Sequence, residues 1–338
     1  MAAVANGMAL HGGIRPYCAT FFSFSDYMKN AIRMSAIMEL PVVYVLTHDS
    51  IGVGEDGPTH QPIEHLTGLR SMPVLKVFRP ADGVETAAAY QSALGDKRPT
   101  AIVASRQELP ALDTGDKAEF KGTSKDAVKG GYVVYDAKPP KAVIMAAGSE
   151  VSISIEAARI LKAEGIAVRV LSMPCLSEFD AQSAEYRESV LPSDIRARVA
   201  VEAGSSMSWG KYVGLDGAYV CIDRFGESGK PEELFKRYGI TPEAVVSAVK
   251  GLLNKDLDGL GKAKAAVQGF AEKVIDTAKD AAGKAKETAG ELAGKAKDMA
   301  QETAGKAKDA ADDVVEKAKE TAAKAMDLVD KIIDKVTT

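Results

Sequence analysis

The sequence predicts an α/β fold: two α/β domains with parallel or mixed sheets, followed by a tail that is α-helical or disordered. Up to about Leu253, short apolar runs alternate with helix-length amphipathic segments, which is the pattern of a sheet flanked by helices. Beyond Leu253 the sequence has no Pro, Arg, Tyr, Trp, His or Cys and consists mainly of Ala, Lys, Glu, Asp, Gly and Thr. This change in composition predicts a different architecture for the last part of the chain.

Size and composition narrow the class of protein. With 338 residues, 46% of them apolar, the chain can bury a sizeable core. Its 43 basic and 47 acidic residues give a net charge of −4, so no general attraction to nucleic acid or to an anionic membrane is expected. The three cysteines lack paired or metal-ligand spacing, and no apolar run has the length of a membrane span. We expect a cytoplasmic protein with no signal peptide and no membrane span.

The first domain is assigned to residues 1–107 and is followed by a linker at 108–141. The linker is polar, rich in Gly and Pro, and has room for one short strand. In the first domain, apolar runs and amphipathic segments predict strands at Val42–Thr47, Val74–Phe78 and Thr100–Arg106, and helices at Phe24–Met38 and Asp82–Leu94.

The second domain is assigned to residues 142–253. Apolar runs predict its strands at Ala142–Ala147, Ile166–Ser172, Ala197–Ala203 and Ala218–Asp223, separated by helices, the first of which ends at Gly165. A hydroxyl cap, a proline and an acid at Thr241-Pro242-Glu243 start a last helix, which we expect to end near Leu253.

The tail, residues 254–338, contains an eleven-residue repeat in which Lys-Ala-Lys recurs at 284–286, 295–297, 306–308 and 317–319. Eleven residues make three helical turns, so one weakly apolar face repeats along a helix. The repeat resembles those of late embryogenesis abundant proteins of group 3. Three glycines each lower helix stability by roughly 1 kcal/mol relative to Ala, and we expect the isolated segment to be a fraying helix or disordered.

The densest group of chemically active side chains lies in THDSIGVGEDGPTHQP, from Thr47 to Pro62. This loop follows an apolar strand, where open α/β sheets place their ligand-binding loops. His48, Asp56 and His60 together favour a functional loop over a structural one. Zinc is the competing chemistry, but neither a His-x-x-x-His spacing nor a Cys ligand is present in the loop.

This loop, with the preceding HGGIRPYCATFFSFSDYMKNAIRM, resembles the signature of transketolases. The similarity continues through SRQ at 105–107, AAGSEV, VAVEAG and FGES, and it covers roughly three quarters of the chain. The 1-deoxyxylulose-5-phosphate synthases share the general plan but are similar in this loop only around its Asp-Gly and Thr-His elements. The resemblance implies a thiamine diphosphate-binding pyrimidine-type domain followed by a transketolase C-terminal-type domain.

In transketolases the positions of Phe21, Phe24 and Tyr27 hold the aminopyrimidine ring of thiamine diphosphate. Rigid aromatic side chains suit a flat heteroaromatic ring. The resemblance further implies the residues that bind the sugar phosphate, His48, Asp56, His60 and Arg106. Asp56 would select the configuration of the hydroxyl beside the carbonyl, and the catalytic His60 would contact the reacting oxygens.

The chain departs from the family at its start, because the glutamate that activates the cofactor would precede Met1. The resemblance also places the ligands of Mg²⁺ or Ca²⁺ on a preceding diphosphate-binding domain, not in this chain. We expect that domain or a subunit as a partner, in a homodimer or heterotetramer acting on sugar phosphates. Three interpretations are open: a fragment of a transketolase, one subunit of a split enzyme, or an inactive remnant whose tail serves in interaction or stress protection.

Overall fold

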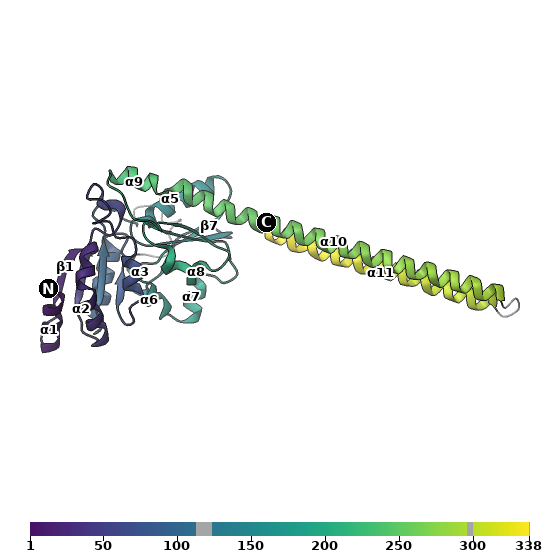
Figure 1. Cartoon of the computed structure of the whole chain (residues 1–338), viewed down its shortest axis with the longest axis horizontal. Coiled ribbons are helices and arrows are strands. Elements are labelled where there is room, and N and C mark those ends of the chain that lie inside the picture. Colours follow the sequence, from purple (N-terminus) through teal and green to yellow (C-terminus); the bar gives the residue numbers. More distant parts are fainter. Residues whose placement is uncertain (113–123, 296–299, 338) are drawn as a thin grey trace. The chain divides into compact units, whose positions relative to one another are not determined.

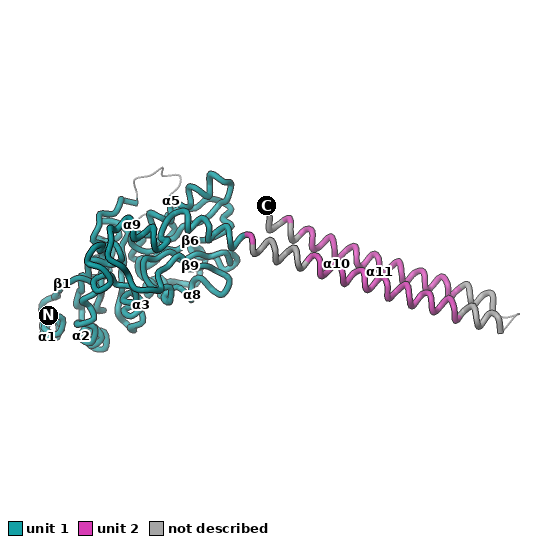
Figure 2. Tube along the Cα trace, turned by 45° about the horizontal axis from the view of Figure 1, so that its top comes forward, with its two compact units in different colours: residues 1–253 teal, residues 254–338 magenta. Residues whose placement is uncertain are grey.

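The computed structural model describes residues 1–112, 124–295 and 300–337. It divides into two compact units, 1–253 and 254–338 (Figure 2). The central part of the predicted linker and the end of the Lys-Ala-Lys repeat at 295–297 lie outside the described residues.

The first unit begins with a four-stranded parallel sheet of strand order β1-β2-β4-β3. Its strands and helices are α1 (Ala2–His11), β1 (Tyr17–Phe21), α2 (Ser25–Ile37), β2 (Val43–Thr47), α3 (His65–Arg70), β3 (Lys76–Phe78), α4 (Gly83–Gly95) and β4 (Thr100–Ala104). Side chains alternate along a strand. In β2, Tyr44 packs in the core of α1, α2 and α3, whereas Val43 packs with Ala89 of α4. The sheet is therefore covered on both faces, as parallel sheets are.

A second sheet follows, with strand order β5-β7-β6-β8-β9, in which only β5 pairs antiparallel. Its elements are β5 (Tyr132–Asp136), β6 (Ala142–Ala146), α5 (Glu150–Ala163), β7 (Val168–Ser172), α6 (Leu176–Asp180), α7 (Ala184–Val190), β8 (Arg198–Glu202), α8 (Gly210–Val213), β9 (Ala218–Cys221), α9 (Pro231–Arg237) and the start of α10 (Pro242–Lys295). Short 3-10 helices lie at Phe22–Phe24, Ile51–Val53, Ser124–Lys129 and Ser206–Trp209. The predicted α/β fold class is confirmed, and β5 brings a strand from the predicted linker into this sheet.

One prediction of local structure is wrong, and one helix was not predicted. The helix that starts at Pro242 does not end near Leu253 but continues to Lys295, because no Pro follows Leu253 and the next glycine, Gly259, comes six residues later and is tolerated inside the helix. Helix α1 was not predicted. Its exposed side carries Val4 and Met8 while its buried side carries Ala2 and Ala5, so apolar residues surround the helix and give no periodic signal.

The second unit is a helical hairpin formed by the rest of α10 and by α11 (Ala300–Thr337) (Figure 1). The two helices run antiparallel, since Lys264 pairs with Asp330 and Lys286 pairs with Asp312. The buried apolar side chains described between them are alanines, Ala271, Ala282 and Ala311. Within the residues described, no helix has the length and apolar character needed to cross a membrane.

Candidate active site

The predicted site residues follow three strands that are neighbours in the first sheet. Phe21 ends β1, His48 comes directly after β2, and Arg106 comes shortly after β4. Because these strands are parallel, their carboxyl ends meet at one edge, which is where open α/β sheets bind ligands.

The aromatic side chains form a connected series at this edge. The rings of Phe21 and Phe24 are nearly parallel with centroids 6.1 Å apart, and Tyr27 follows at 6.3 Å from Phe24. Tyr27 is 89% exposed and Phe24 is 36% exposed. Large aromatic surfaces left in water at a strand end suit a wall of a ring-binding site.

His48 joins this series, because its ring stacks on Phe21 with centroids 3.7 Å apart. Its backbone has a φ of 66°, a left-handed conformation that is uncommon outside glycine and often marks a functional site. Burial and the charge of Arg106 lower the pKa of His48, opposed by Asp56 and Asp49. The imidazole is therefore neutral near pH 7, and Arg106 and Asp56 lie within electrostatic reach of it.

The rest of the loop brings His60 to the same place. The ring of His60 meets Phe24 edge-on with centroids 5.3 Å apart, and its Nδ1 lies 2.9 Å from the Thr59 hydroxyl. Asp56 is exposed at the turn between them. Ring contacts and electrostatic interactions thus connect all seven residues predicted from the sequence.

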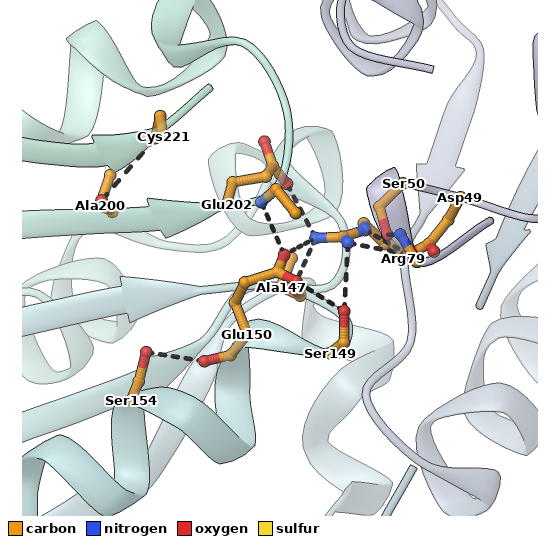
Figure 3. Close-up of polar contacts among 12 residues, drawn as sticks. Asp49, Ser50, Arg79, Ala147, Ser149, Glu150, Ser154, Ala200, Glu202 and Cys221 are labelled. Carbon is orange, nitrogen blue, oxygen red and sulfur yellow. Dashed lines mark hydrogen bonds and ion pairs between the residues drawn. The ribbon is translucent and has the colours of Figure 1, made fainter. Parts of the chain in front are cut away.

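Sequence reasoning missed a buried charge cluster beside this edge (Figure 3). The Arg79 side chain is fully buried, and its Nε donates to Asp49 Oδ2 at 2.9 Å. Its Nη1 donates to the Ala147 carbonyl at 2.8 Å and pairs with the carboxylate of Glu150. A third carboxylate, that of Glu202, lies 3.6 Å from the same nitrogen.

A sequence signal for this cluster did exist. Asp49, Arg79, Glu150 and Glu202 lie at or just after the ends of β2, β3, β6 and β8, so a charged residue closes four apolar strands. Glu202 ends β8 and Glu150 opens α5 after β6, so Arg79 connects the carboxyl end of β3 to the carboxyl ends of two strands of the second sheet. Burial raises the pKa of Glu150, and the attraction of Arg79 offsets this in part.

The Glu202 carboxylate also accepts hydrogen bonds from residues other than Arg79. Arg70 donates to its two carboxylate oxygens at 2.7 and 2.9 Å, and the indole nitrogen of Trp209 donates at 2.8 Å. Burial alone would raise the pKa of Glu202, but the two arginines and these hydrogen bonds hold it below its ordinary value. The cluster fixes the base of the site with buried ion pairs.

Across residues 1–112, 124–295 and 300–337, no group of three or more His, Cys, Asp and Glu side chains is arranged to hold a metal ion. The aromatic wall and the neutral His48 suit a flat, uncharged ring better than a charged group.

Comparison with known proteins identifies the families of the two α/β domains. Residues 1–111 match the family "Transketolase, pyrimidine binding domain", and residues 130–241 match "Transketolase-like TK C-terminal domain". The transketolase of Halalkalibacterium halodurans is 52% identical over 255 residues, which are 75% of this chain and 38% of that protein.

Solved structures agree as well. The transketolase from Leishmania mexicana has a TM-score of 0.68 at 43% identity, over 74% of this chain and 36% of that one. A chain described as "Split gene transketolase, inactive beta4 tetramer" has a TM-score of 0.59 at 26% identity, over 74% of this chain and 80% of that one.

The fold and the matches define two consecutive α/β domains of the transketolase type. The chain belongs to the transketolase family, from which it contains the pyrimidine-binding and C-terminal domains. It spans a little more than a third of the length of the curated H. halodurans relative, at 38%.

Proposed function

We propose that the chain serves in a transketolase, in which a two-carbon ketol unit moves between sugar phosphates with thiamine diphosphate as cofactor. The single observation that supports this most strongly is the continuous contact from Tyr27 through Phe24 and Phe21 to His48. It joins an aromatic wall to the polar loop at one sheet edge, so a ring and a sugar could be bound side by side.

Phe21, Phe24 and Tyr27 would hold the aminopyrimidine ring. Their rings have few rotatable bonds and present open faces, so little conformational entropy is lost when a flat ligand packs on them. When bound, the cofactor supplies a stabilised carbanion for the transferred unit. Its Mg²⁺ or Ca²⁺ would be bound by the diphosphate-binding domain and not by this chain.

The polar residues would bind the sugar phosphate. Arg106 offers a planar fork of donors to phosphate oxygens, and the neutral His48 beside it can donate one hydrogen bond. The Asp56 carboxylate accepts from a sugar hydroxyl and so reads its configuration. His60, next to the aromatic wall, would act catalytically by donating to or moving a proton at the reacting hydroxyl and carbonyl oxygens.

The partner would be a diphosphate-binding domain or subunit that also brings the activating glutamate, in a homodimer or heterotetramer located in the cytoplasm. The split-gene relative supports the subunit interpretation, since this chain covers 80% of it. A second candidate function, an inactive remnant with an interaction or stress-protection tail, is favoured by the eleven-residue repeat and the helical hairpin of unit 254–338.

Donor kinetics test the assigned roles in the enzyme completed with that domain. Asp56→Ala should mainly reduce discrimination between donor sugars that differ at the hydroxyl beside the carbonyl. His60→Ala should lower turnover with every donor, by roughly a hundredfold or more for a lost proton-transfer group. Equal losses for all donors in the Asp56 variant would refute its role in selection.

A further inference from the structure

The loop with Asp56 and His60 is contacted by the second α/β domain, residues 142–253, called the second lobe below. Gln61, adjacent to His60, is only 3% exposed. Its Nε2 donates to the Gly54 carbonyl at 2.8 Å and to the Glu227 carbonyl at 2.9 Å. One amide group thus joins the middle of the loop to a segment 166 residues away in the sequence.

That segment, 225–231, packs closely on the glycines of the loop. A Cβ on Gly57 would come within 2.4 Å of the Ser228 hydroxyl, and a Cβ on Gly54 within 3.2 Å of the Pro231 ring. Both glycines have positive φ, 75° and 86°. Atoms of the second lobe occupy the space that a side chain at either position would need.

The loop also packs closely on a glycine of segment 225–231. A Cβ on Gly226 would lie 1.8 Å from Gln61 Oε1, so this amide packs directly on a bare backbone. Segment 225–231 also contacts the end of α9, because the Tyr238 hydroxyl donates to the Phe225 carbonyl at 2.8 Å and Arg237 pairs with Glu227.

Inside the loop, the chain between these contacts is tightly turned. Gly57 N–H donates to the Gly54 carbonyl at 3.1 Å, and the N–H groups of His60 and Gln61 both donate to the Gly57 carbonyl, at 3.0 and 3.1 Å. Asp56 lies between the two glycines held by the second lobe, and His60 is adjacent to Gln61. Any shift of segment 225–231 would therefore move both polar side chains.

We propose that segment 225–231 sets the conformation of the loop Thr47–Pro62, and that Gln61 is the positioning residue through which it orients Asp56 and His60. The second lobe thereby influences sugar recognition through the loop, without contacting the sugar. The effect on sugars rests on the proposed function, whereas the effect on the loop can be measured without it.

Hydrogen–deuterium exchange and histidine NMR of the full chain test this proposal. The chain has four histidines, so the His60 and His48 rings can be resolved individually. Gln61→Leu, which keeps the bulk but loses the donor, should raise amide exchange in 54–61 roughly tenfold and shift the His60 ring signals. Gln61→Asn, which can keep one of the two bonds, should give a smaller change.

Gly226→Ala approaches the same contact from the second lobe and should reproduce both changes. The two substitutions together should do no more than either alone, because they break one contact. Gln182→Leu is the matched control, since Gln182 donates to the nearby Glu178 carbonyl at 2.9 Å. It should change neither the exchange in 54–61 nor the His60 signals.

Loop exchange and His60 signals that stay native in Gln61→Leu or Gly226→Ala would overturn the proposal, as would exchange raised uniformly through the chain. In the completed enzyme, Gln61→Leu should raise KM for the donor sugar phosphate more than it lowers kcat. If the loop loosens while no ketol transfer can be measured for any variant, the proposed function fails and the positioning role stands.

Discussion

The Arg79 guanidinium and the Glu150 carboxylate form an ion pair between the two sheets with both side chains fully buried. Arg79 follows β3 of the first sheet, and Glu150 opens α5 directly after β6 of the second. The pair therefore fixes how the two lobes meet at the base of the proposed site.

Replacing Arg79 by Met should destabilise the first unit by about 3 to 5 kcal/mol, because Asp49, Glu150 and Glu202 would be left buried without their counter-ion. Urea unfolding followed by the fluorescence of Trp209, the single tryptophan, measures this. Adding Glu150→Gln should recover part of the loss, since one uncompensated charge is removed. A loss below 1 kcal/mol would mean that the cluster is not desolvated.

An exposed arginine provides the control for this experiment. Arg159 pairs with Glu156 at 3.6 Å, and the two side chains are 45% and 54% exposed. Arg159→Met should change the free energy of unfolding by less than about 0.5 kcal/mol.

Glu85 links stability to pH. It is fully buried, accepts from the Tyr132 and Ser172 hydroxyls at 2.8 and 2.6 Å, and joins α4 to the second sheet. Burial raises its pKa from 4.5 to about 7, against the effect of these hydrogen bonds, and the charge of Asp82 adds to the rise. Between these two pH values the folded chain binds more protons than the unfolded chain, so this contribution to stability is complete at low pH and is lost as the pH rises to about 7.

The contribution amounts to about 3 kcal/mol at most. Urea unfolding at pH 5 and pH 8 should show that Glu85→Gln removes this part of the pH dependence, whereas Glu156→Gln on the exposed side of α5 keeps it. An unchanged difference between the two pH values in Glu85→Gln would contradict the assignment.

Val74 has a φ of 72° although its side chain is β-branched, which is a strained conformation. Asn tolerates this region, and the side chain is 39% exposed, so Val74→Asn should stabilise the chain by about 1 kcal/mol. Val84→Asn, in α4 at 37% exposure and without positive φ, should give no gain. Thermal unfolding of both variants measures this. A destabilised Val74→Asn variant would show that the contacts of the native valine side chain outweigh the backbone strain.

The tail should be dispensable for the fold of residues 1–253. Helix α10 buries Val245, Val249 and Leu252 in the core of the second sheet before Leu253, and a chain cut after Leu253 keeps these contacts. Its melting temperature should stay within a few degrees of the full chain, and a larger drop would mean that the tail packs on the first unit.

The isolated segment 254–338 should be poorly helical in dilute buffer and gain helix in trifluoroethanol. The buried apolar side chains described in the hairpin are alanines, which remove little area from water. Circular dichroism of the segment measures this, and full helicity in buffer would contradict it.

The sequence predicted the strands best where apolar runs were continuous, as in β2 and β6. Clustering in one loop indicated His48, Asp56 and His60, whereas the resemblance to transketolases added Phe21, Phe24, Tyr27 and Arg106 as expected site residues. Neither route reveals Gln61, and the charge that follows β3 marks Arg79 without identifying its partners. Their partners lie far along the chain, Glu227 for Gln61 and Glu150 for Arg79, and such pairings depend on how the two sheets meet. The left-handed backbone of Val74 was equally hidden, since valine does not favour it.

Ketol transfer from xylulose 5-phosphate to ribose 5-phosphate tests the central claim most directly. It should be measured with the chain 1–338 alone, and again after mixing with a diphosphate-binding domain that carries the activating glutamate, with thiamine diphosphate and Mg²⁺ present. We predict that the chain alone transfers no ketol unit and that the mixture does. The mixture should lose this transfer when the His60→Ala variant is used in place of the native chain. Transfer by the chain alone, or an assembled complex that binds the cofactor and transfers nothing, would contradict the account.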